Sequence, residues 1–174
     1  MMIEIRTARN EDYKEIQHVV QRAFENEEMS DHNEHHLVIK IKDSDAYIPE
    51  LSLVAIEAGK IVGHIMLSKI TINNDEEHIE SLALAPVSVL PEFQNRGIGS
   101  ILIKKSIVIA EQLGFTSIIV LGHDTYYPKF GFEEAEKYNI YPPFEVPSHY
   151  FMVKFLTDDV RCINGIVQYS KAFE

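Results

Sequence analysis

Two glycines, Gly97 and Gly99, stand where an apolar run gives way to a helical pattern, in the stretch PVSVLPEFQNRGIGSILIKKS. The first backbone N–H groups of a helix have no partner inside the helix and carry partial positive charge. Glycines at these positions let an anion approach that backbone closely. The pattern predicts a phosphate-binding helix start, to which Arg96 adds a cation. Tight packing of the helix against a strand is the structural alternative.

Two common phosphate motifs do not fit this stretch. A dinucleotide fingerprint requires G-x-G-x-x-G, and its third glycine is replaced by Leu102. A P-loop requires Gly-Lys-Ser/Thr after four spacer residues, and no such triplet follows. A nicotinamide-dependent oxidoreductase is therefore disfavoured.

A strand, a helix and a second strand are expected to position these glycines. Residues 79–90 form an apolar run typical of a central strand. Residues 97–113 follow a helical pattern that Gly114 ends, and residues 115–122 form a second buried strand. A helix of this length between two strands of one sheet makes them parallel.

The remaining segments extend this βαβ unit into an α/β domain. A strand is expected at 3–7, helices at 13–24 and 36–42, and a hairpin at 51–72 that turns at residues 58–60. After the βαβ unit we expect a short helical turn at 126–130, an edge strand at 131–135, a proline-bearing loop at 136–148 and closing strands at 149–156 and 164–170. The sequence thus predicts one domain over residues 1–174, with a mixed, mostly antiparallel sheet, one central parallel unit and helices on both faces.

Composition excludes several classes of function. The chain has 174 residues, a formal net charge of −11 and a pI near 5.1, which disfavours binding to nucleic acid or to an anionic membrane surface. Cys162 is the only cysteine, so no internal disulfide is expected. The start lacks an apolar signal core, and no apolar run approaches the ~20 residues that span a bilayer. We expect a cytoplasmic protein.

The glycine motif, read as Q-x-x-G-x-G after a strand, resembles the GNAT superfamily of acyl-CoA-dependent N-acetyltransferases. A second segment, Tyr127-Pro-Lys-Phe-Gly131-Phe132, resembles the Y-x-x-x-G-F signature of that superfamily. The longer form, from Leu121-Gly122-His123 through the second segment, is similar to a bacterial single-domain branch, the YhbS-like predicted N-acetyltransferases. The resemblance runs from the first strand almost to the C-terminus.

This resemblance implies a GNAT fold with splayed central strands and acetyl-CoA as co-substrate. The strand before the motif would carry a bulge, and its backbone, at Val87 and Val89, would pair with the pantetheine arm. The cradle for the pyrophosphate would consist of Gln94, Asn95, Arg96, Gly97, Ile98, Gly99 and Ser100.

The resemblance also assigns catalytic roles. Tyr127 would be the general acid for the CoA thiolate; a packed structural tyrosine is the alternative, and Tyr126 is expected to be structural. Glu80, His64 and His123 are candidates for the base. Each has a structural alternative. Glu80 would be a solvated charge at the end of a strand, His64 a half-buried residue of the sheet, and His123 a residue that forms hydrogen bonds within a loop. Ordered water and backbone carbonyls could also replace a dedicated base.

The acceptor is expected to be an amine on a small molecule or a peptide. The acidic surplus suits a cationic amine, and Glu27, Glu28, Asp31 and Glu34 fall in the region that covers the acceptor side of the superfamily. A non-catalytic module that binds acyl-CoA is the alternative function, and a homodimer through exposed final strands is a further expectation. His32 and His36 have helical i, i+4 spacing, but without H-E-x-x-H we predict no metal.

Overall fold

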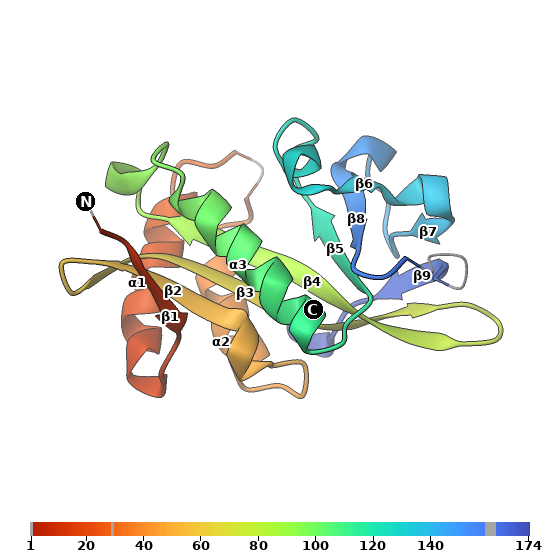
Figure 1. Ribbon diagram of the computed structural model, residues 1–174, viewed down its shortest axis with the longest axis horizontal. Helices are drawn as coiled ribbons and strands as arrows, with labels where there is room; N and C mark the ends of the chain where they lie inside the picture. The colour runs from red at the N-terminus through yellow and green to blue at the C-terminus, as the bar shows by residue number, and fades with distance from the viewer. Residues whose placement is uncertain (1, 29, 159–162) are drawn as a thin grey trace.

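The computed structural model describes residues 2–28, 30–158 and 163–174, so the prediction for Cys162 lies outside the described residues. The described residues form one nine-stranded mixed sheet in the order β1-β2-β3-β4-β5-β8-β6, and β9 pairs with both β3 and β7 (Figure 1). The strands are β1 Glu4–Thr7, β2 Ser52–Glu57, β3 Lys60–Asn73, β4 His78–Val89, β5 Ser117–Leu121, β6 Glu133–Glu134, β7 Ile140–Tyr141, β8 Phe151–Phe155 and β9 Gly165–Gln168. The helices are α1 Tyr13–Phe24, α2 Glu34–Lys42 and α3 Ile98–Gln112.

The predicted hairpin between β2 and β3 is confirmed, and its turn explains its register. Ala58 and Gly59 both have positive φ, +50° and +79°, and Glu57 pairs with Lys60 across them. A two-residue turn with this backbone matches the twist of the flanking strands. Strand β3 then runs for 14 residues and bonds β2 along its first half and β9 along its second half.

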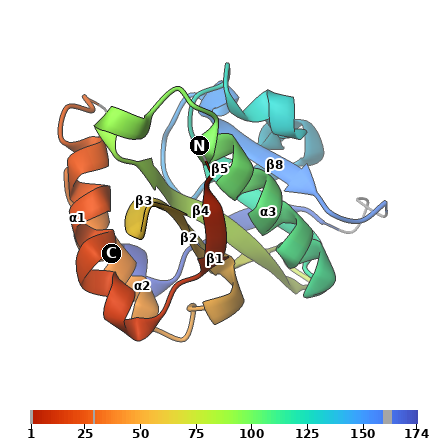
Figure 2. The same ribbon diagram turned by 60° about the vertical axis from the view of Figure 1, so that its left-hand side comes forward.

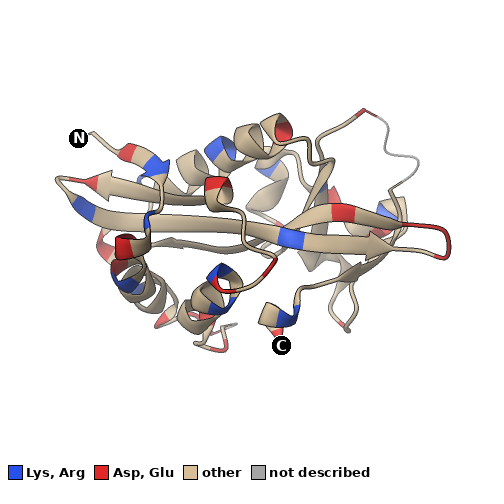
Figure 3. Ribbon diagram, turned by 90° about the horizontal axis from the view of Figure 1, so that it is seen from below, with Lys and Arg blue, Asp and Glu red and all other residues tan. Residues whose placement is uncertain are grey.

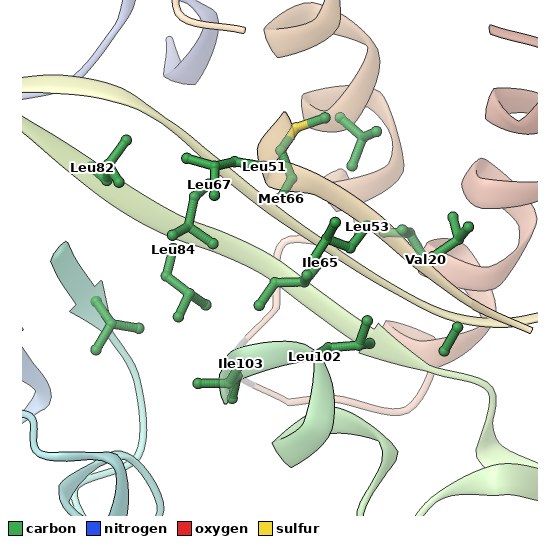
Figure 4. Close-up of a cluster of buried hydrophobic side chains, with 14 of the residues drawn as sticks. Val20, Leu51, Leu53, Ile65, Met66, Leu67, Leu82, Leu84, Leu102 and Ile103 are labelled. Carbon is green, nitrogen blue, oxygen red and sulfur yellow. The ribbon is translucent and has the colours of Figure 1, made fainter. Parts of the chain in front are cut away.

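Helices cover both faces of the sheet, as predicted. Figure 2 shows α1 and α2 on one side and α3 on the other. Ile16 and Val20 of α1, four residues apart, and the adjacent Leu102 and Ile103 of α3 are fully buried on the helix faces that meet the sheet. Figure 4 shows Val20 of α1 and Leu102 and Ile103 of α3 packed against the strands from different sides.

The two central strands separate halfway along β4. The parallel pairing of β4 with β5 comprises only Leu82 with Ile118 and Ala83 with Ile119, although β4 continues against β3 as far as Val89. The β3–β4 register shifts between Ile65 and Leu67, which places a bulge in β4 near Ala85. The predicted bulge and splay are therefore present, and the gap opens beside the start of α3.

Two details of the sequence prediction are wrong. Strand β7 lies inside the predicted loop at 136–148, and its parallel pairing with β9 adds a second parallel pair to the sheet. The final strands are also not open edges, because β8 bonds β5 and β6 while β9 bonds β3 and β7. Strand β7 was missed because it has only two residues and is followed by prolines, so it is too short to show the alternation of apolar and polar residues that predicts a strand.

Candidate active site

The loop between β4 and α3 presents the start of the helix to solvent. The side-chain amide of Gln94 donates to the carbonyl of Val89 at 3.1 Å and so ties the loop to the end of β4. Asn95 and Gly97 have φ of +65° and +80°, and nothing lies within 4 Å of a Cβ placed on Gly97. The first helical bond runs from the N–H of Ile101 to the carbonyl of Gly97, at 3.0 Å. The N–H groups of the three residues in between precede that bond and point out of the helix start.

The predicted cradle residues play different parts in this geometry. Ile98 is 2% exposed, so its side chain belongs to the core and only its backbone faces the loop. The guanidinium of the exposed Arg96 lies over the ring of Phe93, 5.2 Å from its centroid. Val87 and Val89 are half-buried on β4, beyond its last pair with β5. The structure brings these residues together at one edge of the gap, on the side of α3.

Tyr126, which was expected to be structural, lies beside the first turn of α3. Its hydroxyl lies 3.5 Å from Oγ of Ser100, and a Cβ on Gly99 would lie 3.3 Å from the same hydroxyl. Gly99 therefore makes room for a tyrosine as well as for an anion. The ammonium of Lys129 lies 4.1 Å above the Tyr126 ring, which brings a cation to the same place.

Tyr127 begins the 3-10 turn η4, Tyr127–Phe130, and is 8% exposed. A Cβ on Gly122 would lie only 2.4 Å from Cε2 of Tyr127, so the absent side chain of Gly122 is what admits the ring. The ring packs edge-on against Phe132, 5.7 Å between centroids. Burial raises the pKa of Tyr127, which keeps its hydroxyl protonated at neutral pH. A protonated hydroxyl is what a general acid requires.

His123 contributes through its backbone. Its carbonyl accepts the N–H groups of Tyr126 at 3.2 Å and Tyr127 at 3.3 Å, whereas its side chain is exposed. The backbone of this residue therefore helps to shape the turn that carries both tyrosines.

The other two candidates for the base lie away from the gap or out of reach. Glu80 is exposed beside Gly114 and Thr116 at the far end of α3, three residues and thus roughly 10 Å along the strand before Ala83, where the pairing with β5 ends. His64 is fully buried, and its Nε2 bonds Oγ of Ser52 at 3.0 Å. Burial lowers the pKa of His64 to about 3, so the ring is neutral near pH 7 but closed to solvent.

A cleft of about 1820 Å³ opens where β4 and β5 separate. Ala83, Ala85 and Leu121 from the two strands lie at its floor, residues of α2 form one wall, and the segment 165–174 forms another. Asp31 and Glu34, two of the four acidic residues expected near the acceptor, line it. Sequence reasoning did not anticipate the C-terminal wall, because only the pairing of β9 with β3 brings that segment here.

Two further expectations concern metal and membrane. His32 has φ of +61° and precedes α2, so it does not share a helical face with His36. No group of three or more metal-binding side chains occurs among residues 2–28, 30–158 and 163–174. In the same ranges, no helix is long and apolar enough to span a bilayer.

Comparisons with known proteins agree with this geometry. The Acetyltransferase (GNAT) family model matches residues 4–132. The uncharacterised N-acetyltransferase YjhQ of Escherichia coli K12 is 33% identical over 161 residues, which are 90% of this chain and 86% of that protein.

Two crystal structures share the fold over nearly the whole chain. A GNAT family acetyltransferase from Brucella melitensis, in complex with acetyl-CoA, has a TM-score of 0.82 and 32% identity and covers 99% of both chains. YhbS from Escherichia coli, in complex with CoA, has a TM-score of 0.88 and 24% identity and covers 98% of this chain and 91% of its own. The chain therefore belongs to the GNAT family of acetyltransferases.

Proposed function

We propose that this GNAT acetyltransferase moves an acetyl group from acetyl-CoA to a primary amine while both substrates are bound. One observation carries the proposal. The strands β4 and β5 part after Ala83, the unpaired end of β4 runs to the open start of α3 at Val89, and the turn with Tyr126 and Tyr127 adjoins that helix start. The Brucella relative, crystallised with acetyl-CoA, supports the choice of cofactor.

The donor groups at the gap suit a CoA thioester. The N–H groups of Ile98, Gly99 and Ser100 precede the first helical bond, and the space beside Gly97 is open, so a pyrophosphate there would be stabilised by the partial charge of the helix. Beyond Ala83, the β4 backbone has no partner in β5 and is free to pair with the amides of a pantetheine arm. Arg96 and Lys129 bring positive charge to an otherwise acidic protein.

The chain supplies three functions for the transfer. A backbone N–H of β4 near Val89 polarises the thioester carbonyl while the neutral amine nitrogen attacks its carbon. The C–S bond breaks, and the hydroxyl of Tyr127 gives its proton to the departing thiolate. The attacking nitrogen loses one proton to water, and Tyr127 regains one from solvent. The products are an N-substituted acetamide and CoA with a free thiol.

Water in the cleft serves as the base in this proposal. Glu80 lies on the still-paired side of Ala83 beside the end of α3, the His64 ring is closed to solvent, and the His123 side chain lies on the exposed loop. The apolar floor contributes as well, because an amine loses its proton more readily where its charge is poorly solvated.

The test combines calorimetric titration with acetyl-CoA and a free-thiol assay on wild-type protein and Tyr127→Phe. We expect micromolar binding by both proteins, with NADH as a ligand that neither binds. Turnover of the variant should fall roughly 100-fold or more, in the range expected for a lost general acid. Equal turnover would remove Tyr127 from the mechanism. Binding without turnover by wild-type protein on any amine would favour the non-catalytic module, and no binding of acetyl-CoA would refute the proposal.

A further inference from the structure

One wall of the cleft is aromatic. Phe144 stacks on Tyr169 with ring planes 27° apart and centroids 6.1 Å apart. The ring centroids of Tyr169 and Phe173 lie 5.0 Å apart. We name these three side chains, all of which line the cleft, the aromatic wall. Burial raises the pKa of Tyr169, so the wall stays uncharged at neutral pH.

Apolar surface is exposed along the path from the gap to this wall. Leu121, at the end of β5, is 46% exposed, Phe144 is 43% exposed and Ile166 is 55% exposed, and all three line the cleft. Large apolar side chains left in water at a single concavity mark a binding surface. The surface is continuous with the gap, because Leu121 and Ala85 lie at the floor where the strands separate.

The charged side chains that line the cleft are mainly acidic. Its lining contains four carboxylate side chains, Asp31, Glu34, Asp75 and Glu174, and two lysines, Lys40 and Lys171. Figure 3 shows acidic residues in the loop between β3 and β4, which contributes Asp75. One oxygen of Glu34, Oε2, accepts a hydrogen bond from Ser30, and the other, Oε1, is buried without a partner. The excess of carboxylates favours a cationic ligand.

From these observations we infer the chemical class of the acceptor. It is a monoamine on an aromatic or otherwise apolar body, which lies on the aromatic wall while its nitrogen reaches the gap beside Leu121. The carboxylates attract the ammonium form at the mouth of the cleft, and the apolar floor favours the neutral form at the point of attack. This inference rests on the proposed function.

Other acceptors fit the same surface less well. A polyamine or an aminoglycoside would bury ammonium or hydroxyl groups against Phe144 and Ile166, whose side chains offer no hydrogen-bond partner. An apolar body has no hydrogen bonds to water to lose there, and its transfer from water to the apolar surface is favourable. Selectivity therefore arises from the wall more than from the charges.

The test is a free-thiol assay with full-length protein, acetyl-CoA and four amines: 2-phenylethylamine, putrescine, kanamycin and a peptide with a free N-terminus. We expect kcat/KM for 2-phenylethylamine to exceed that for each of the others about tenfold or more. Phe144→Ala should lower kcat/KM for 2-phenylethylamine about tenfold, mainly through KM, and leave the calorimetric Kd for acetyl-CoA unchanged. Tyr141→Ala is the matched control, because Tyr141 is 41% exposed nearby but does not line the cleft.

The outcomes separate this inference from the function on which it rests. Preference for putrescine, kanamycin or the peptide overturns it, as does an unchanged KM in Phe144→Ala. Binding of acetyl-CoA without turnover of 2-phenylethylamine overturns it too and leaves the cofactor site intact. Failure to bind acetyl-CoA at all refutes the proposed function itself.

Discussion

Neighbouring tyrosines in one turn face different surroundings. The rings of Tyr126 and Tyr127 lie 81° apart, edge to face. This orientation sends the Tyr126 hydroxyl to the first turn of α3 and buries Tyr127 against Gly122 and Phe132. The two rings thus lie in different surroundings, the first beside the start of α3 and the second largely buried.

Tyr126→Phe should weaken the binding of acetyl-CoA without slowing turnover at saturation. The variant loses one hydroxyl at the edge of the cradle, and a single hydrogen bond of this kind contributes about 1 kcal/mol, or roughly fivefold in Kd. Calorimetry measures the effect, and Tyr138→Phe is the control, because its hydroxyl bonds Glu133 elsewhere on the surface. An unchanged Kd together with a large loss of turnover would make Tyr126, rather than Tyr127, the acid.

The sequence predicted the position of Tyr127 but not the environment of Tyr126. The Y-x-x-x-G-F pattern is local, so Tyr127 could be recognised from residues 127–132 alone. The contact of Tyr126 with Gly99 and Ser100 joins residues about 26 positions apart, and it exists only because α3 crosses the sheet beside η4. Glu80 shows the converse, since its place on β4 was predictable from the sequence but its position beside the end of α3 was not.

At the scale of elements, the site depends on how α3 begins. Gly97 caps the helix in a left-handed conformation, which a side chain tolerates at a cost of about 1 kcal/mol, and it faces open space. Strand β4 was predictable from its apolar run, α3 from the helical spacing of its apolar residues, and the end of α3 from Gly114. The splay was expected only through the family resemblance, since no periodicity marks the point where β4 and β5 stop pairing.

Gly97→Glu should abolish measurable binding of acetyl-CoA, with a loss of at least about 100-fold in affinity. The new carboxylate projects into the open space before the helix start and repels a phosphate there. Gly59→Glu is a closely matched control, because Gly59 has φ of +79° and equally open surroundings in the β2–β3 turn. Both variants should lose similar stability in thermal unfolding. Normal binding by Gly97→Glu would show that the cradle lies elsewhere.

At the scale of the whole molecule, a chain of buried polar groups ties α1 to the sheet. The Tyr13 hydroxyl bonds the hydroxyls of Tyr47 and Ser52, each at 2.9 Å, and Ser52 bonds His64 at 3.0 Å. The folded protein therefore needs His64 neutral, because among the described residues no charged group compensates a buried imidazolium there. The sequence contains eight histidines, and its composition did not indicate that His64 would be buried in the core.

This buried ring makes stability depend on pH in a defined window. The pKa of His64 is about 3 in the folded protein and about 6.5 in the unfolded chain, so the unfolded state binds the additional proton between these values. The free energy of unfolding should therefore fall as pH drops from about 6.5, by up to about 1.4 kcal/mol per unit of pH from this residue. Urea denaturation at pH 7.5, 6.0 and 5.0 measures the slope.

His64→Gln should flatten that slope, whereas His78→Gln should leave it unchanged, because His78 is exposed at the start of β4. Titration of the native protein by NMR gives a check that does not depend on folding of the variant. The imidazole of His64 should show no protonation shift between pH 7.5 and 4.5. Protonation of the native ring near pH 6 would mean that the pocket around Ser52 admits water, and the acid sensitivity would then have to arise from other groups, such as the Arg6–Asp12 pair.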